Sequence, residues 1–473
     1  MIRRIICTRR QFSTKSISQP LKILSAISDP NRQNAIAVQD KLGNLSYKEL
    51  DSLSDKVADH IQTNHTAINS TIAGLNDSNR FYVISMLAAW KLGKRFMPLS
   101  PSHTKHEIDY YINDSSANMI LYSNLASSNA NKTSIDALVS SSSSLQSLNI
   151  ETYLQSTQGT GTDTKTRDIN QSSSSGLVVY TSGKSLRVTN HCCLVINSLI
   201  CVYTCLYIYT GTTGSPKGVL HNADNINHMI DALVQAWEYT SNDRILHFLP
   251  LHHVHGILNK LLCVLYVGGT VDFNTSTKAL KLWKSLAKES YTRSVDAQHK
   301  PLTLFMAVPT IYSKLLEEAE KVAARHNLSL PALSETLRLA TDSAIVAMMN
   351  ERNEVVSKDS LTIVELRDAL LTVSSLHLMV SGSAALPETV MNSWKTLTGH
   401  TLLERYGMTE IAMALTNPYK GKRHVGCVGA PLPLVQCRLV DDQGATIEAA
   451  DVPGEIRIKV SKHSMYGSYV YIY

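Results

Sequence analysis

Two glycine-bearing fragments, separated by a hydrophobic stretch, constrain this chain more than any other feature. The sequence "VVYTSG" occupies residues 178–183, and "TGTTGSPKG" occupies residues 210–218. The run "LVVY" at 177–180 is short and apolar, which is typical of a buried strand. Joined directly, the fragments would form a strand followed by one loop rich in Thr, Ser and Gly. The sequence therefore predicts a strand–loop unit that is interrupted between residues 183 and 211.

The composition of the joined loop indicates phosphate binding. Backbone N–H groups of such a loop can surround phosphate oxygens, and glycine lets the backbone approach closely. The loop is not a Walker A motif, because Lys217 is followed by Gly-Val rather than by Ser or Thr. We predict that a phosphate group is bound by Thr181, Ser182, Gly183, Gly211, Thr212, Thr213, Gly214 and Lys217.

The order of apolar patterns predicts an α/β fold. Between residues 22 and 125, helical patterns such as "YVISMLAAWKLG" alternate with short apolar runs such as "FMPLSP". This alternation predicts βαβ units and a mostly parallel sheet. The Ser-rich stretch 126–176 is predicted to be largely a surface linker. Later runs, including "TLFMAVP" and "LHLMVSG", predict further strands with helices between them.

The charge of the chain is concentrated at its N-terminus. The net charge is +6, and the first twenty residues carry five basic residues and no acid, which leaves +1 for the rest. A nearly neutral body gives no electrostatic reason to expect nucleic-acid binding. The Arg- and Ser-rich composition of residues 1–20 is typical of a mitochondrial transit peptide, which predicts a matrix protein. A disordered basic tail is the alternative.

The stretch between the two fragments has two interpretations. Residues 191–210 contain no acid or base other than a histidine and are long enough to span a bilayer. Their many Val, Ile, Thr, Tyr and Cys residues nevertheless weaken the prediction of a helix. Alternatively, residues 184–210 are a translated intron, because codons for Gly183-Lys184-Ser185 can contain GTAAGT and those for Thr210-Gly211 can supply an acceptor AG. In that case the correctly spliced protein has no stable membrane span.

Further motifs extend the pattern along the chain. With the joined loop, they resemble the signature motifs of the adenylate-forming superfamily, which includes acyl-CoA synthetases, luciferases and adenylation domains. The resemblance covers most of residues 22–459 and is strongest to mitochondrial malonyl-CoA synthetases. The motifs are "LSYKEL" (45–50), "LPLHHVHGILNKLLCVLYVGG" (249–269), "LMVSGSAALP" (378–387), "LLERYGMTEIAMALTNP" (402–418) and "GEIRIK" (454–459).

The resemblance implies a fold and a reaction. Residues 21–459 would form the large N-terminal domain, with two layered α/β subdomains and a small β-barrel-like part. ATP, Mg²⁺ and coenzyme A would be the cofactors. A carboxylate would first react with ATP to an acyl-adenylate, and coenzyme A would then displace AMP. Malonate is the predicted acid. The alternatives are a medium- or long-chain fatty acid, or a non-catalytic, membrane-tethered nucleotide-binding protein.

The resemblance also implies roles for single residues. His255, Glu410 and Lys217 would be catalytic, and Glu410 with Thr212 would hold Mg²⁺. His255 would lie at the carboxylate pocket, and Arg405 would bind the distal carboxylate of malonate, unless its role is structural. Zinc binding by His252, His253 and His255 lacks further ligands in the sequence. The nucleotide would also contact Gly382, Ser383, Ala384, Tyr406, Gly407, Met408 and Thr409.

Two departures from the family pattern predict an impaired chain. The first is the interrupted loop. The second is the sequence after Lys459, where the family continues with a hinge and a small C-terminal domain that carries a catalytic lysine. Residues 460–473 are instead predicted to be an aberrant tail, and the small domain to be missing. Because losing one electrostatic contributor lowers a rate by about 10²- to 10³-fold, we expect no measurable ligase activity from this polypeptide.

Overall fold

The computed structural model describes most of the chain. The described residues are 20–65, 68–124, 145–157, 175–181, 191–196, 199–204, 216–273, 276–296, 298–449, 452–460 and 470–471.

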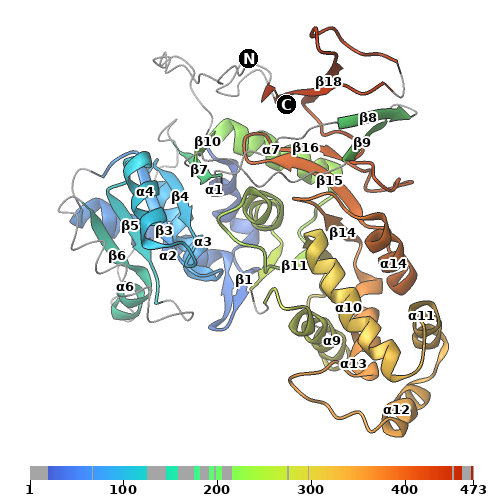
Figure 1. Ribbon diagram of the computed structural model, residues 1–473. Coiled ribbons are helices and arrows are strands. Elements are labelled where there is room, and N and C mark those ends of the chain that lie inside the picture. Colours follow the sequence, from blue (N-terminus) through green and yellow to red (C-terminus); the bar gives the residue numbers. More distant parts are fainter. Residues whose placement is uncertain are drawn as a thin grey trace.

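A six-stranded sheet organises the N-terminal half (Figure 1). Its strand order is β10-β7-β4-β3-β5-β6, and all neighbouring pairs are parallel except β7 and β10. The predicted mostly parallel sheet is thus confirmed. The strands are β3 (Thr71–Leu75), β4 (Arg95–Leu99), β5 (Met119–Tyr122), β6 (Gln146–Asn149), β7 (Gly176–Tyr180) and β10 (Gly218–Asn222).

The helices of this half begin at clear capping signals. Ser46 and Glu49 form a capping box at the start of α2 (Tyr47–Asn64), and Thr104 and Glu107 form one at α4 (Lys105–Ser115). Helix α3 (Arg80–Lys91) is buried on all sides over Phe81–Trp90. The prediction that residues 126–176 are largely a linker was partly wrong. Strand β6 adds to the sheet there, and helix α6 (Ile150–Ser156) follows it. Residues 125–144 and 158–174 lie outside the described part.

A second sheet of nine strands forms the centre of the molecule, in the order β17-β16-β15-β14-β13-β11-β12-β1-β2. The pairs from β1 through β12, β11, β13 and β14 to β15 are parallel, and both ends of the sheet are antiparallel. The strands are β1 (Ile36–Asp40), β2 (Gly43–Ser46), β11 (Arg244–Leu246), β12 (Thr270–Asp272), β13 (Leu304–Ala307), β14 (Leu378–Ser381), β15 (Leu403–Met408), β16 (Ala412–Thr416) and β17 (Ala430–Pro431).

Helices cover both faces of this sheet (Figure 1). The helical elements of this part are α1 (Lys22–Ile27), a 3₁₀ turn (Pro30–Arg32), α7 (Ala223–Trp237), a π-helix (His255–Leu262), α8 (Cys263–Val267), α9 (Ala279–Val295), α10 (Pro309–Arg325), α11 (Leu330–Leu339), α12 (Asp342–Glu351), α13 (Ile363–Ser375) and α14 (Glu388–Thr398). Of these, α11 packs on α10 and α14, and α12 packs on α13, rather than on the sheet.

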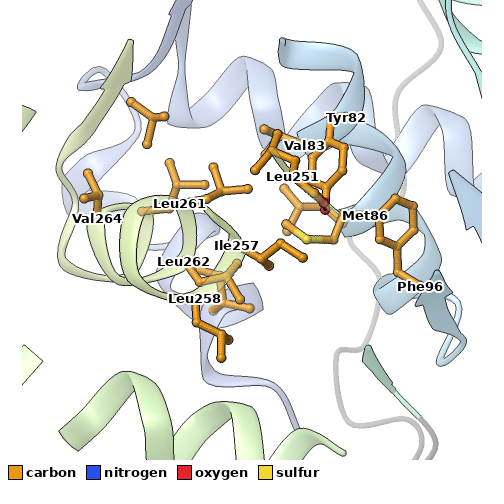
Figure 2. Close-up of a cluster of buried hydrophobic side chains, with 14 of the residues drawn as sticks. Tyr82, Val83, Met86, Phe96, Leu251, Ile257, Leu258, Leu261, Leu262 and Val264 are labelled. Carbon is orange, nitrogen blue, oxygen red and sulfur yellow. Dashed lines mark hydrogen bonds between the residues drawn. The ribbon is translucent and has the colours of Figure 1, made fainter. Parts of the chain in front are cut away.

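One hydrophobic cluster joins the two halves (Figure 2). Tyr82 and Met86 of α3 meet Ile257 and Leu261 of the π-helix, and all four side chains are at most 1% exposed. Burying each such side chain contributes about 1.5–3 kcal/mol. The cluster therefore fixes the π-helix, which carries His255, against the first sheet.

Three strands near the C-terminus form a small antiparallel sheet, in the order β18 (Val435–Val440), β19 (Glu455–Val460) and β20 (Val470–Tyr471). With the two α/β subdomains it completes the predicted architecture, and the expected α/β fold class is confirmed.

The apolar stretch between the two glycine-bearing fragments forms strands rather than a helix. β8 (His191–Ile196) and β9 (Leu199–Thr204) pair antiparallel, with Cys193 opposite Val202. The interpretation of these residues as a membrane-spanning helix was wrong, as their β-branched and aromatic composition suggested. Over the described residues, none of the helices is both long and apolar enough to cross a membrane.

Candidate active site

The two ends of the interrupted loop lie side by side. Strands β7 and β10 pair antiparallel, with Tyr180 opposite Gly218. Beyond that pair, the N–H of Thr181 donates to the carbonyl oxygen of Lys217 at 3.0 Å, and the N–H of Lys217 lies 3.3 Å from the Thr181 hydroxyl oxygen. The chain thus leaves the sheet at Thr181 and returns beside it at Lys217. The other predicted phosphate-binding residues, Ser182, Gly183, Gly211, Thr212, Thr213 and Gly214, lie outside the described residues.

The turn Thr409–Ile411 connects β15 to β16 as a tight hairpin. A Cβ at Gly407 would lie 2.1 Å from the carbonyl oxygen of Ala412, so no other residue fits the backbone approach there. Thr409 is half-buried, whereas Glu410 is exposed at the tip of the hairpin. A lone exposed carboxylate at this place is free to contact a ligand.

His221 of β10 connects the two features. Its Nε2 donates to the carbonyl oxygen of Thr409 at 2.8 Å. Burial lowers the pKa of His221, so the ring is neutral at pH 7 with its proton on Nε2. The strand that follows the predicted phosphate loop is therefore hydrogen-bonded to the Thr409–Glu410 turn. Sequence reasoning did not single out His221, although it is a polar residue directly after the apolar Val219 and Leu220.

His255, Ser383 and Arg405 converge from three separate segments. The Ser383 hydroxyl oxygen lies 3.2 Å from Nδ1 of His255 and accepts a hydrogen bond from Nη2 of Arg405 at 3.2 Å. His255 and Arg405 are each 3% exposed. Arginine only donates, so Ser383 has its own proton available for His255 Nδ1. This leaves the proton of the neutral imidazole on Nε2, which has no partner among the described residues.

The electrostatics of this group favour an anion. Burial lowers the pKa of Arg405 to about 9, which keeps the guanidinium charged at neutral pH. Burial, and then the charges of Arg405 and Lys260, hold the pKa of His255 well below its usual value. Within the described part of the chain, no acidic side chain forms an ion pair with Arg405, and its Nε has no hydrogen-bond partner. A buried cation without a counter-charge is costly unless a ligand supplies one.

Gly382 has a steric reason to lack a side chain. A Cβ at this position would lie 2.4 Å from Nε and 2.5 Å from Cζ of Arg405. The guanidinium therefore lies directly over the Gly382 backbone. The next residue, Ser383, has a φ of 68°, which turns the chain sharply after β14. Sequence reasoning placed Gly382 and Ser383 in the nucleotide pocket, and the structure brings them into contact with Arg405 as well.

The remaining predicted nucleotide contacts follow the same strands. Ala384 is exposed, next to Ser383. Tyr406 and Met408 of β15 are half-buried and pack against the hydrophobic cluster that includes Ile411 and Leu439. Their contacts with a nucleotide stay predictions.

A cavity of about 490 Å³ lies where the two subdomains meet. The loops after β3 and β4, at Asn76–Ser78 and Ser100–Ser102, form one side, and Phe248 and His252 lie on the other. The carboxyl ends of neighbouring parallel strands are where α/β sheets usually bind ligands. The sequence signal for this cavity was the polar residues that follow each apolar run, in "GLNDS" and "PLSPS". A hollow of about 790 Å³ near α1 is lined by none of the predicted site residues.

Among the residues that the structure describes, there is no group of three or more His, Cys, Asp or Glu side chains arranged to hold a metal ion. His252 and His253 do lie together, with ring centroids 4.2 Å apart, and His103 lies beside His252.

The AMP-binding enzyme family matches residues 28–185 and 199–469. The chain belongs to this family. A malonate–CoA ligase ACSF3, mitochondrial, from Xenopus laevis is 33% identical over 443 residues, which are 92% of this chain and 63% of the relative. The human protein of the same name is 31% identical over 86% of this chain and 58% of its own length. The chain therefore spans less than two thirds of these relatives.

Solved structures show the same fold. The ATP-bound structure of MatB from Rhodopseudomonas palustris has a TM-score of 0.66 and 22% sequence identity, covering 93% of this chain and 70% of that one. A ternary product complex of a malonyl-CoA ligase, with methylmalonyl-CoA and AMP bound, has a TM-score of 0.61 at 22% identity. Both confirm the adenylate-forming architecture that the motifs predicted.

Proposed function

We propose that this protein, with its phosphate loop uninterrupted, is an ATP-dependent acid–thiol ligase that converts malonate to a coenzyme A thioester. The observation that carries the proposal is the pair of buried side chains His255 and Arg405, which both contact the exposed Ser383 and form no ion pair with an acid among the described residues. The names of the relatives, several of them malonate–CoA ligases, support the same acid.

The first half-reaction depends on position and charge. A carboxylate of the acid attacks the α-phosphorus of ATP, and pyrophosphate leaves. His255 would donate from Nε2 to the attacking carboxylate, and Thr409 would donate to the α-phosphate. Lys217 would neutralise the phosphates. Holding the reacting groups in this way replaces a bimolecular encounter and is worth up to about 7–11 kcal/mol.

Magnesium and coenzyme A complete the proposed set of ligands. Glu410 would hold Mg²⁺ together with the phosphates of ATP and with Thr212. One exposed carboxylate fits this use, because Mg²⁺ is usually bound through one or two carboxylates plus substrate phosphates. The metal supplies charge neutralisation at the phosphates. In the second half-reaction the thiol of coenzyme A displaces AMP.

Arg405 favours malonate over a fatty acid. A guanidinium binds a carboxylate through two parallel hydrogen bonds, so the distal carboxylate of malonate would satisfy it. An alkyl chain would leave it buried and unpaired, which costs about 3–5 kcal/mol. We expect Arg405→Met to abolish the preference for malonate over octanoate. ATP–pyrophosphate exchange with both acids, in a chain lacking residues 184–210, tests this, and preferential exchange with octanoate by the unmutated enzyme would favour the fatty-acid alternative.

We further propose that residues 184–210 are a translated intron and that the chain containing them is inactive. The match to the family omits residues 186–198, and β8 and β9 pair only with each other in the described part. An apolar insert between Thr181 and Lys217 would displace the phosphate-binding backbone. Sequencing the mature transcript tests the origin. The exchange assay tests the consequence, and turnover by the full chain would contradict it.

The mitochondrial matrix is the proposed location. The names of the vertebrate relatives include the word mitochondrial, and residues 1–20 are basic and free of acids. A fluorescent protein fused behind residues 1–20 is expected to enter mitochondria. Replacing Arg3, Arg4, Arg9 and Arg10 with Gln should leave it outside, and uptake of the Gln variant would count against a transit peptide.

A further inference from the structure

Lys260 is a fully buried lysine without an acidic partner. Its side chain is 0% exposed, its Nζ donates to the carbonyl oxygen of Met306 at 3.0 Å, and the ammonium lies 3.9 Å from the centre of the Phe248 ring. Lys91 differs from Lys260 in having acidic partners. The side chain of Lys91 is also only 5% exposed, but it pairs with Asp51 at 2.6 Å and Asp55 at 2.9 Å. Among the described residues, no ion pair involves Lys260.

The π-helix His255–Leu262 brings Lys260 to the side of His255. Hydrogen bonds from residue i to residue i+5 place residues five apart about one turn from each other. In an α-helix the same two residues would be rotated by about 140°. Ile257, Leu258 and Leu261 point into the apolar cluster of Figure 2, and the polar residues of the helix fall between them. The charge of Lys260 contributes to the lowered pKa of His255, as expected for close neighbours.

The contacts of the two side chains lie at the carboxyl ends of adjacent parallel strands. Lys260 contacts Met306 near the end of β13, and His255 contacts Ser383 just after the end of β14. Met306 is opposite Val380 in the register of these strands. This edge is where parallel sheets bind their ligands. Arg405 of β15 lies at the same edge, so two buried basic side chains come from neighbouring parts of one end of the sheet.

Unpaired polar atoms gather at the same place. Both side-chain polar atoms of Asn259, Nδ1 of His247 and the hydroxyl of Ser381 are buried without hydrogen-bond partners in the described part of the chain, as are Nε2 of His255 and Nε of Arg405. Buried polar groups are almost always hydrogen-bonded in folded proteins. Such a concentration near two basic side chains suits a polar, anionic ligand better than an alkyl chain.

We propose that Lys260 is a specificity-determining residue of the acid pocket, which together with Arg405 selects acids that carry a second carboxylate. This inference rests on the proposed function. Without ligand, burial lowers the pKa of Lys260 well below its usual value, because the charged form is disfavoured away from water. A dicarboxylate beside Lys260 would raise this pKa again, so its binding is expected to be accompanied by proton uptake. The titratable groups that face Lys260 are His247 and His255, and Arg405 adds its fixed charge.

Calorimetry on the full chain, and on the chain lacking residues 184–210, tests the inference. Malonate is compared with isovalerate, in which an isopropyl group replaces one carboxylate, at pH 8 in two buffers of different ionisation enthalpy. Malonate is expected to bind more tightly than isovalerate. Binding of malonate should be accompanied by proton uptake, and binding of isovalerate should not. Binding of malonate without proton uptake overturns the inference in the unmutated protein, independently of any variant.

Lys260→Met, which keeps the length of the side chain, is expected to weaken malonate binding by about 10- to 100-fold, to leave isovalerate unchanged and to remove the proton uptake. Lys260→Gln serves if the Met variant does not fold. Lys300→Met is the matched control, because Lys300 also donates to a carbonyl oxygen, that of Ser241, but lies before β13 at the opposite end of the sheet.

Two failures are distinguishable. If the unmutated chain lacking 184–210 exchanges pyrophosphate with malonate, but Lys260→Met keeps the malonate preference or the proton uptake, only the role of Lys260 is wrong. If neither unmutated chain binds malonate and no exchange occurs, the proposed function itself is wrong, and the role of Lys260 falls with it.

Discussion

The imidazole of His221 donates to the carbonyl oxygen of Thr409 across 188 positions of sequence, at a distance of 2.8 Å. Four positions before His221, Lys217 ends the interrupted loop beside Thr181. One short strand thus holds the proposed phosphate loop and the Thr409–Glu410 turn in a fixed relation. This hydrogen bond links the two parts of the chain that are proposed to contact the triphosphate.

Replacing His221 with Leu is expected to weaken this connection. The carbonyl of the half-buried Thr409 would lose its donor, which costs up to about 1–3 kcal/mol of stability. In the chain lacking 184–210, we also expect about tenfold weaker ATP binding, because the turn that carries Thr409 and Glu410 loses its anchor. Urea unfolding and fluorescence titration measure the two effects. His228→Leu is the control, since His228 donates to the Asp224 carbonyl within its own helix, and equal losses of ATP affinity in both variants would contradict the anchoring role.

Gly382→Ala should affect acid binding without much effect on folding. The added Cβ would lie 2.4 Å from Nε of Arg405, which is the movable end of a side chain. We expect a stability change below about 1 kcal/mol and about tenfold weaker malonate binding, because the guanidinium is pushed from its place. A double-mutant cycle checks the cause. In an Arg405→Met background, Gly382→Ala should no longer change malonate affinity, and an unchanged tenfold loss would exclude displacement of Arg405 as the reason.

The strands of both sheets and the ends of the loop were predictable, because short apolar runs bounded by Gly, Pro and polar residues carry that signal locally. The meeting of His255, Ser383 and Arg405 was not, although each residue was a candidate. Ser383 is 128 positions from His255 and 22 from Arg405. Such contacts depend on the order of β13, β14 and β15 in the sheet, and the pattern of each strand says nothing about its neighbours.

Lys260 shows a different limit. In the sequence it is a lysine in the apolar run "GILNKLLCVLYV", which suggests an exposed face of a helix. Apolar periodicity does not separate a π-helix from an α-helix over eight residues, and only the π-helix brings positions 255 and 260 to one side. The interpretation of residues 191–210 as a membrane-spanning helix was wrong for another reason. The apolar length of this stretch fits a membrane span, whereas its β-branched residues favour the strands that form.

The stability of the fold is expected to fall as the pH falls below 6.5. Eight histidines of the described residues have lowered pKa values, mainly because burial disfavours their charged form, so the unfolded chain binds more protons there. A fully buried one such as His247, with a pKa of about 3, contributes up to about 1.4 kcal/mol per pH unit. The eight are His60, His103, His221, His247, His252, His253, His255 and His400.

Glu404 opposes this trend. Burial raises its pKa to about 7, so the folded state gains a proton there that the unfolded state gains only near 4.5, and this contribution is lost as the pH rises. One carboxyl cannot offset several histidines, so the midpoint of urea unfolding should be lower at pH 5.5 than at pH 7.5. In Glu404→Gln the decrease should be larger, because the opposing group is gone. A midpoint that is equal or higher at pH 5.5 would refute the assignment of neutral buried histidines.

Removing residues 184–210 is expected to stabilise the fold and to create the ATP site. The segment between Thr181 and Lys217 has 35 residues, and the deletion leaves eight. Closing the shorter loop costs about 1.3 kcal/mol less entropy, since the closure cost scales as (3/2)RT ln n. The β7–β10 pair needs no rearrangement, because its register is already that of a short hairpin connection. A variant in which 27 Gly and Ser residues replace 184–210 separates length from sequence. Its urea unfolding midpoint should equal that of the full chain or lie slightly above it. It should bind no ATP. If this variant binds ATP as well as the deletion does, contiguity of the two glycine-bearing fragments is not what forms the phosphate site.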